Sequence, residues 1–313
     1  MSETPLHFKT ITELAALIKS KALSPVEVTE AMLARIQAQD SQYKSYATVM
    51  AEQARASAQA AEQAIAAGNY LGSLHGVPVA VKDLCFTRGV ATMGATKALM
   101  GHVPDFDCTV VQKLNAAGAI ILGKLNLTEG AMAGYSPEFQ VPVNPWGANL
   151  WSGASSSGSG VATAAGLCYG SLGSDTGGSI RFPSAACGIV GIKPTWGRVS
   201  RYGVLALAES LDHIGPMTRS AADAGIMLQV IAGLDPNDPT SLSAPVPDML
   251  EGIDQGVRGL RIGLDEDYIS GDTDPQLTKS VLAGIQVLEG LGAVMVPIQM
   301  PDGSDYMEAW AAL

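Results

Sequence analysis

The 313-residue sequence contains few of the residues that most often bind metals or nucleic acids. It has four histidines and four cysteines, with no Cys-x-x-Cys, no His-Glu-x-x-His and no histidines four residues apart. We therefore expect no metal site. Lysine and arginine together number 19 against 30 acidic residues, which gives a net charge of −11. Without a basic stripe, we expect no nucleic-acid partner.

Long uninterrupted apolar segments are also absent, although 47% of the residues are hydrophobic. The apolar runs are short and broken by glycine, so we expect no transmembrane helix and no membrane partner. The first residues, MSETPLHF, lack the positive segment and apolar run of a secretory signal. These features predict a cytoplasmic, globular protein with buried thiols; a homodimer is compatible with them.

The first third of the sequence predicts helices. Thr10-Ile-Thr-Glu13 and Ser24-Pro-Val-Glu27 each have the form of a capping box, with apolar residues three and four apart behind it. An alanine-rich run over residues 51–67 predicts a third helix. We expect residues 1–70 to form a helical segment that packs on a core made by residues 71–313.

The middle of the sequence alternates between strand and helix patterns. Short apolar runs at 77–81 and 119–122 predict buried strands, and residues 109–117 between them predict an amphipathic helix. This alternation is typical of an α/β fold with a mixed or parallel sheet.

Towards the end, a turn and a strand are expected within 258–265 and a second strand at 294–298, with a helix at 275–291 between them. The sequence stops at Leu313 inside a helical pattern without a capping signal. We expect the fold to be incomplete at this end.

Several common catalytic motifs are missing. No serine has glycine both two residues before and two residues after it, so the nucleophile elbow of the α/β-hydrolases is excluded. No P-loop is present, and residues 158–163 fall one glycine short of a dinucleotide-binding fingerprint. His213 is the best of the four histidines as a base, but a lone histidine is more often structural.

Lysine and serine chemistry remains. Lys82 ends an apolar strand, where burial would lower its pKa and let it act as a base; a salt bridge or a surface position is the alternative. Small residues fill two segments, 152–160 and 173–179. In the second, Gly177-Gly178-Ser179 could form a turn whose N–H groups bind an oxyanion, or a plain surface turn.

Six segments together resemble the amidase signature family. They are long, ordered and correctly spaced, and with the capped helices the resemblance covers nearly the whole chain. The segments are Gly76–Asp83, Ala119–Asn126, Asn144–Trp146, Gly173–Pro183, Cys187–Thr195 and Leu211–Pro216.

The resemblance implies a mixed β-sheet flanked by helices on both faces, and specific roles for residues. Ser179 matches the nucleophile that forms an acyl-enzyme, Lys82 the base, and Ser155 the bridging serine, which in the family follows a cis peptide bond. The N–H groups of Thr176, Gly177, Gly178 and Ser179 match the oxyanion hole.

The resemblance also suggests residues around the catalytic groups. Candidates for substrate binding follow a motif that lies near the acyl pocket of relatives; they are Met132, Ala133, Gly134 and Tyr135. Asp175 and Arg181 are expected to support the turn.

The sequence departs from the family in the loop 153–158. Ala154 and Ser157 stand where the family has glycines, so a positive φ at either position would be strained. Ser156 and Ser157 are rivals of Ser155 for the bridging role. Family members also usually extend some hundred residues beyond residue 313.

The function implied by the resemblance is hydrolysis of a small carboxamide, an ester or a carbamate, without a metal or organic cofactor. The alternative is the glutaminase (A) subunit of a tRNA-dependent amidotransferase, which works with partner subunits.

Overall fold

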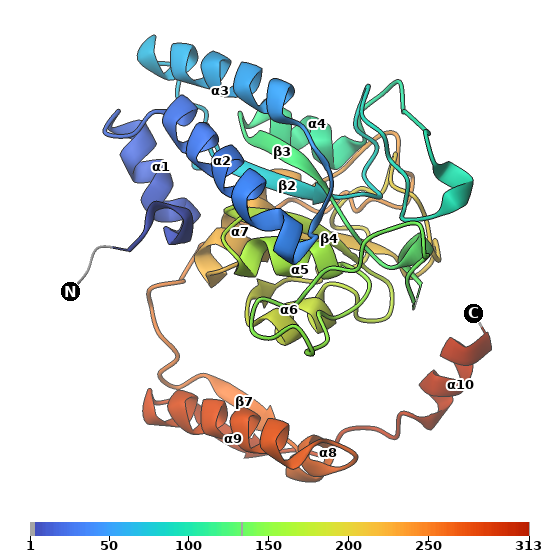
Figure 1. Ribbon diagram of the computed structural model, residues 1–313. Coiled ribbons are helices and arrows are strands. Elements are labelled where there is room, and N and C mark those ends of the chain that lie inside the picture. Colours follow the sequence, from blue (N-terminus) through green and yellow to red (C-terminus); the bar gives the residue numbers. More distant parts are fainter. Residues whose placement is uncertain (1–3, 133, 313) are drawn as a thin grey trace. The chain divides into compact units, whose positions relative to one another are not determined.

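The computed structural model describes residues 4–132 and 134–312, which divide into two compact units, Met1–Leu250 and Glu251–Leu313. The strands of the first unit are β1 (Tyr46–Val49), β2 (Pro78–Lys82), β3 (Ile120–Leu125), β4 (Gly170–Asp175), β5 (Val190–Gly191) and β6 (His213–Thr218). Its α-helices are α1 (Ile11–Lys19), α2 (Pro25–Tyr43), α3 (Ala51–Ala66), α4 (Thr109–Ala116), α5 (Ser157–Ala164), α6 (Arg181–Cys187) and α7 (Ala221–Ile231). Figure 1 shows the sheet at the centre of this unit, with helices around it.

The six strands form one mixed sheet in the order β1-β3-β2-β4-β6-β5. β2 runs parallel to both β3 and β4, and the outer pairings are antiparallel. Ligand sites in such sheets lie beyond the carboxyl ends of the parallel strands. Lys82 ends β2 and Asp175 ends β4, so these two residues meet at one edge of the sheet.

Helices cover both faces of the sheet. Ser171 in β4 donates a hydrogen bond from its Oγ to the Ser159 carbonyl in α5 at 3.1 Å. A Cβ on the preceding residue, Gly170, would instead point at the sulfur of Met227 in α7. Neighbouring residues of a strand face opposite sides, so α5 and α7 lie on opposite faces. The mixed α/β sheet with helices on both faces, predicted from the sequence, is confirmed.

The predicted helix starts are confirmed in detail. Thr10 and Ser24 each accept a backbone N–H through the side chain, and Glu13 and Glu27 complete the two capping boxes. α1 is also tied to α7, because the Asp223 carboxylate accepts the N–H groups of Ile11 at 3.0 Å and Thr12 at 3.1 Å. The boundary expected at residue 70 stays a prediction.

The second unit contains a two-stranded parallel sheet of β7 (Arg261–Leu264) and β8 (Val294–Pro297). Its helices are α8 (Glu266–Ser270), α9 (Pro275–Gly290) and α10 (Ser304–Ala312). Among the described residues, no helix is both long and apolar enough to cross a membrane. All four cysteines are buried free thiols, as expected.

Gly158, in the first turn of α5, lies very close to the backbone of two other segments, those of Asn126 and Ser45. A Cβ there would lie 2.4 Å from the carbonyl oxygen of Asn126 and 2.6 Å from that of Ser45. Both contacts are backbone atoms that cannot move aside cheaply, so we expect Gly158→Ala to lower the free energy of unfolding by about 3 kcal/mol. Urea-induced unfolding measures the difference.

The matched control is Gly284→Ala in α9, where a Cβ would meet nothing within 4 Å. Because alanine is the better helix former, this variant should be unchanged or more stable by about 0.5–1 kcal/mol. Equal stability of Gly158→Ala and the parent protein would contradict the close-packing argument.

Candidate active site

Lys82 is buried at the end of β2 with only hydroxyl partners. Its side chain is 1% exposed, and Nζ donates hydrogen bonds to Oγ of Ser155 at 2.7 Å and to Oγ of Ser174 at 2.8 Å. In the described part of the chain, no carboxylate lies within ion-pair distance of it. The surface and salt-bridge alternatives for Lys82 are therefore not what the structure shows.

This environment changes the acidity of Lys82. Desolvation by burial lowers its pKa from 10.5 to about 7, and the electrostatic effects of Cys85, Asp175 and Asp212 oppose that shift only in part. At that pKa, about half of the lysine is neutral at pH 7 and can accept a proton. The acidic neighbour in the sequence, Asp83, pairs with Lys124 instead, at 3.1 Å between buried atoms.

The loop that precedes α5 presents Ser155 to Lys82. The peptide bond between Ala154 and Ser155 is cis. Ser156, one of the rival serines, turns away: its Oγ donates to the carbonyl of Ser174 at 3.2 Å. Ser157, the other rival, begins α5. Lys82 therefore contacts Ser155 alone of the three.

Glycine is required in this loop at position 153. Gly153 has φ of +79°, and a Cβ on it would lie 2.2 Å from Cα of Pro183. Ala154 and Ser157, which replace family glycines, do not have positive φ. The strain considered for these two positions does not arise.

Ser179 lies in the turn between β4 and α6, half-buried and next to the loop of Ser155. Its carbonyl accepts the N–H of Ser156 at 3.2 Å, which joins the two segments through their backbones. The structure thus brings Lys82, Ser155 and Ser179 to one edge of the sheet, with Ser179 the most exposed of the three.

Asp175 supports this turn from beneath. Its buried carboxylate accepts the N–H groups of Gly178 at 2.8 Å and Ile180 at 3.1 Å, and the Arg181 guanidinium at 2.9 and 3.0 Å. Burial alone would raise the Asp175 pKa, but the Arg181 guanidinium and the N–H groups outweigh it and hold the pKa below its usual range. The supporting role expected for Asp175 and Arg181 agrees with these contacts.

The four expected oxyanion donors differ in their surroundings. The N–H of Gly178 is taken by Asp175. Thr176 is held through its side chain, which donates to Asp212 at 2.5 Å. The N–H groups of Thr176, Gly177 and Ser179 have no acceptor among the described residues, so they are available to a developing negative charge.

His213 is part of the support of this turn. Its Nδ1 lies 3.1 Å from the carbonyl oxygen of Asp175, and its Nε2 lies 3.1 Å from Nζ of Lys193. Burial and the nearby Lys193 charge lower the His213 pKa. Both ring nitrogens are thus occupied, which agrees with a structural role.

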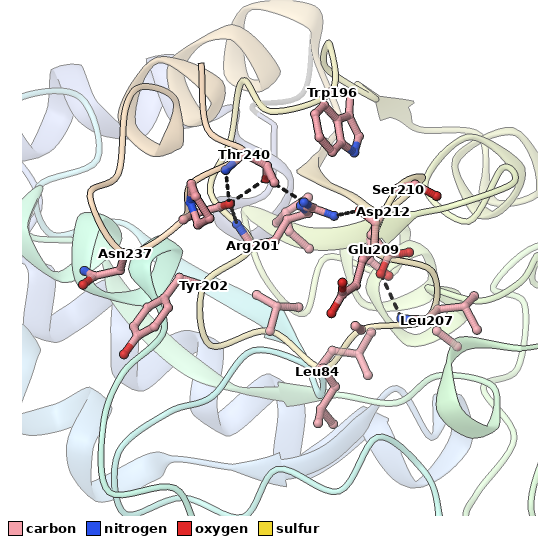
Figure 2. Close-up of a pocket in the computed structure, with 18 residues that line it drawn as sticks. Leu84, Trp196, Arg201, Tyr202, Leu207, Glu209, Ser210, Asp212, Asn237 and Thr240 are labelled. Atoms are coloured by element: carbon pink, nitrogen blue, oxygen red, sulfur yellow. Dashed lines mark hydrogen bonds between the residues drawn. The ribbon is translucent and has the colours of Figure 1, made fainter. Parts of the chain in front are cut away.

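A cavity of about 480 Å³ opens beside Lys82. Ser174, the second partner of Lys82, lines it, and so does Asp212; Figure 2 shows the lining residues. Its apolar wall consists of Leu84, Ala131, Val204, Leu205, Ala206, Leu207 and Ile214. Its polar part includes Arg201, Glu209, Asp238 and Thr240.

Of the residues expected to bind substrate, Met132, Gly134 and Tyr135 do not line this cavity. Met132 is 60% exposed and Gly134 is exposed, whereas Tyr135 is half-buried. Ala133 lies outside the described residues. Their neighbour Ala131 does line the cavity.

Comparison of the sequence with known protein families shows to which family this chain belongs. A family profile described as Amidase matches residues 27–312. This chain belongs to the amidase signature family.

Among curated relatives, a putative amidase AmiD of Mycobacterium tuberculosis is 58% identical over 238 residues, which are 76% of this chain and 50% of that protein. The A subunit of the glutamyl-tRNA(Gln) amidotransferase of Geobacter metallireducens is 49% identical over 302 residues, 96% of this chain and 62% of that protein. The chain thus spans half to about three fifths of the length of these relatives.

Among solved structures, the peptide amidase of Stenotrophomonas maltophilia has a TM-score of 0.89 at 34% identity, over 97% of this chain and 65% of that one. The A subunit of the glutamyl-tRNA(Gln) amidotransferase of Thermotoga maritima has a TM-score of 0.82 at 35% identity, over 96% and 63%.

Sequence reasoning missed Ser174 and gave Asp212 no role. One signal could have indicated Ser174. It lies one residue before the end of β4, and β4 pairs with β2, the strand that Lys82 ends. Asp212 belongs to the segment Leu211–Pro216 that resembles the family. Its partner Thr176 is 36 residues away in the sequence, so no local pattern indicates their contact.

The buried Lys82 predicts a pH-dependent stability. The unfolded chain holds one more proton than the folded chain between pH 7 and 10.5, so stability rises with pH across this window. Lys82→Met removes the buried ammonium and should therefore stabilise the protein below pH 7. The pKa shift sets a ceiling of about 5 kcal/mol on this gain in stability, and the lost hydrogen bonds reduce it to about 1–3 kcal/mol.

Urea-induced unfolding at pH 6 and pH 10 checks this, with the gain present at pH 6 and absent at pH 10. The exposed Lys44→Met is the control and should show no difference between the two pH values. A Lys82→Met effect that is equal at both would refute the lowered pKa.

Proposed function

We propose that this protein is an amidase that hydrolyses a small carboxamide through an acyl-enzyme on Ser179, with Ser155 and Lys82 as its proton relay. The observation that carries the proposal is the buried Lys82, which contacts Ser155 Oγ at 2.7 Å without a carboxylate partner. A base with a pKa near the operating pH combines a useful neutral fraction with sufficient proton affinity. The same site could act on an ester or a carbamate.

In the proposed reaction, the three side chains act in sequence. Neutral Lys82 takes the proton of Ser155 Oγ, and Ser155 takes that of Ser179 as Ser179 Oγ attacks the carbonyl carbon. The free N–H groups of the turn, those of Thr176, Gly177 and Ser179, stabilise the negative oxygen that forms. The proton returns to the leaving nitrogen, the C–N bond breaks, and water repeats the path to release the acid.

A glutaminase of an amidotransferase is the second candidate, because such a protein matches 96% of the chain at 49% identity. The AmiD relative favours a stand-alone amidase with 58% identity, although it matches less of the chain. Release of ammonia from simple amides by the purified protein alone would favour the amidase. Activity only in the presence of partner subunits would favour the glutaminase.

We further propose a cytoplasmic location and no cofactor, which four free thiols and a serine–lysine site support. A homodimer remains compatible, and the net charge of −11 argues against nucleic acid as a partner.

Covalent labelling tests the nucleophile. A fluorophosphonate should form a bond to Ser179, located by peptide mass spectrometry, and Ser179→Ala should lose the label and at least about 10⁴-fold in kcat. If the folded protein is labelled elsewhere or not at all, the proposed nucleophile is wrong.

The same assay ranks the loop serines. Ser155→Ala should slow labelling by about 10²-fold or more, because the proton relay is broken. Ser157→Ala, in the neighbouring position, should cost less than about tenfold. Equal losses in the two variants would argue against Ser155 as the bridge.

The cavity is our proposed site for the acyl group, since its volume lies in the range of small-molecule sites. Ala206→Trp should fill part of it and lower kcat/KM for amides with a bulky acyl group by about tenfold or more, while acetamide is less affected. Ala60→Trp on the exposed side of α3 is the control. Equal losses for small and bulky amides would show that the acyl group lies elsewhere.

A further inference from the structure

We propose that Asp212 is a positioning residue of this site, whose carboxylate ties the loop that walls the cavity to the turn that carries Ser179. The inference rests on the proposed function, because it concerns how Ser179 and its N–H donors are held for reaction. It adds a residue that touches none of the reacting atoms.

The contacts of Asp212 join two segments that are distant in the sequence. The residue is 8% exposed. Its Oδ2 accepts the N–H of Leu207 at 2.8 Å, a bond drawn in Figure 2, and both carboxylate oxygens lie 3.1 Å from the N–H of Ala208. Its Oδ1 also accepts the hydroxyl of Thr176. One side chain therefore holds the cavity wall and the start of the turn.

The turn needs such a tether because of its composition. Gly177 and Gly178 have no Cβ and leave the backbone many conformations. Asp175 fixes the far side of the turn through Gly178 and the residues that follow. The near side is fixed through Thr176 and Asp212, so the orientation of the Gly177 N–H depends on this bond.

Asp212 also acts on Lys82 through its charge. Together with Cys85 and Asp175, it favours the protonated amine and partly opposes the effect of burial. No cation in the described chain forms an ion pair with Asp212. Arg201, the basic residue of the cavity, donates to the hydroxyl of Thr240 at 2.6 Å and lies over the ring of Trp196.

Other charged groups lie around Asp212 and bear on this effect. Glu209 and Asp238 line the same cavity, and both are acidic. His213 follows Asp212 in the chain and is held by Lys193 and the Asp175 carbonyl. Asp212→Asn changes none of these groups, so a change in the pH profile can be assigned to its own charge.

The chain offers a closely matched control in Asp223. This buried carboxylate also accepts two backbone N–H groups and one threonine hydroxyl, those of Ile11 and Thr12. It joins α1 to α7 and is not among the charges that act on Lys82. Asp223→Asn therefore removes the same kind of interaction without reaching the site.

The experiment measures the rate of Ser179 labelling by a small alkyl fluorophosphonate between pH 5 and pH 10, on the full-length protein. In Asp212→Asn the rate at pH 9 should fall at least about tenfold, because the oxyanion donors are no longer held in place. The midpoint of the rise with pH should move down by about 0.5 unit, since a charge that favours protonated Lys82 is gone. Asp223→Asn should keep the parent's rate and midpoint.

Thr176→Val is the second variant and keeps the carboxylate and the cavity wall. It should lose labelling rate without moving the midpoint, and it tests the tether if Asp212→Asn fails to fold. The inference is overturned if Asp212→Asn behaves like Asp223→Asn, or if Thr176→Val keeps the parent's rate. A parent protein that is not labelled at Ser179 at any pH would instead overturn the proposed function.

Discussion

The site depends on an ammonium group that is removed from water without a carboxylate to neutralise it. Lys82 is held at the end of a central strand by two hydroxyls, those of Ser155 and Ser174. Hydroxyls satisfy its hydrogen bonds but contribute no net charge, so desolvation dominates and the pKa falls to about 7. If Lys82 formed an ion pair with a carboxylate, as Lys124 does with Asp83, the carboxylate would favour the protonated amine, which cannot accept a proton. The two buried lysines thus differ in their partners, which are two hydroxyls for Lys82 and a carboxylate for Lys124.

The surrounding structure supplies what this arrangement requires. Parallel strands β2 and β4 end at the same edge, which brings Lys82 and the turn of Ser179 together. Two carboxylates, Asp175 and Asp212, then hold the turn from its two sides. Their charges raise the Lys82 pKa, against the effect of burial. The same groups that position the nucleophile therefore limit how far the base can be shifted.

Much of the fold could be predicted because its signals are local. The capping boxes at Thr10 and Ser24, and the apolar runs of β2 and β3, depend on neighbouring residues only. The site was harder to predict, because Lys82 and Ser155 are 73 residues apart in the sequence. Only resemblance linked them, and burial alone left the state of Lys82 open. The roles of Ser174 and Asp212 needed the strand pairing and the loop path, which no local pattern specifies.

The contact between Gly153 and Pro183 has a consequence for how this site can change. The two residues flank Ser155 and Ser179, and they approach so closely that no side chain fits at position 153. A shift of the loop of Gly153 would push directly on α6, which contains Pro183, because interiors are packed without spare volume. The loop of Ser155 and the turn-and-helix segment that carries Ser179 therefore constrain each other's position. Transplanting the site into another scaffold would require moving both segments together with their mutual spacing.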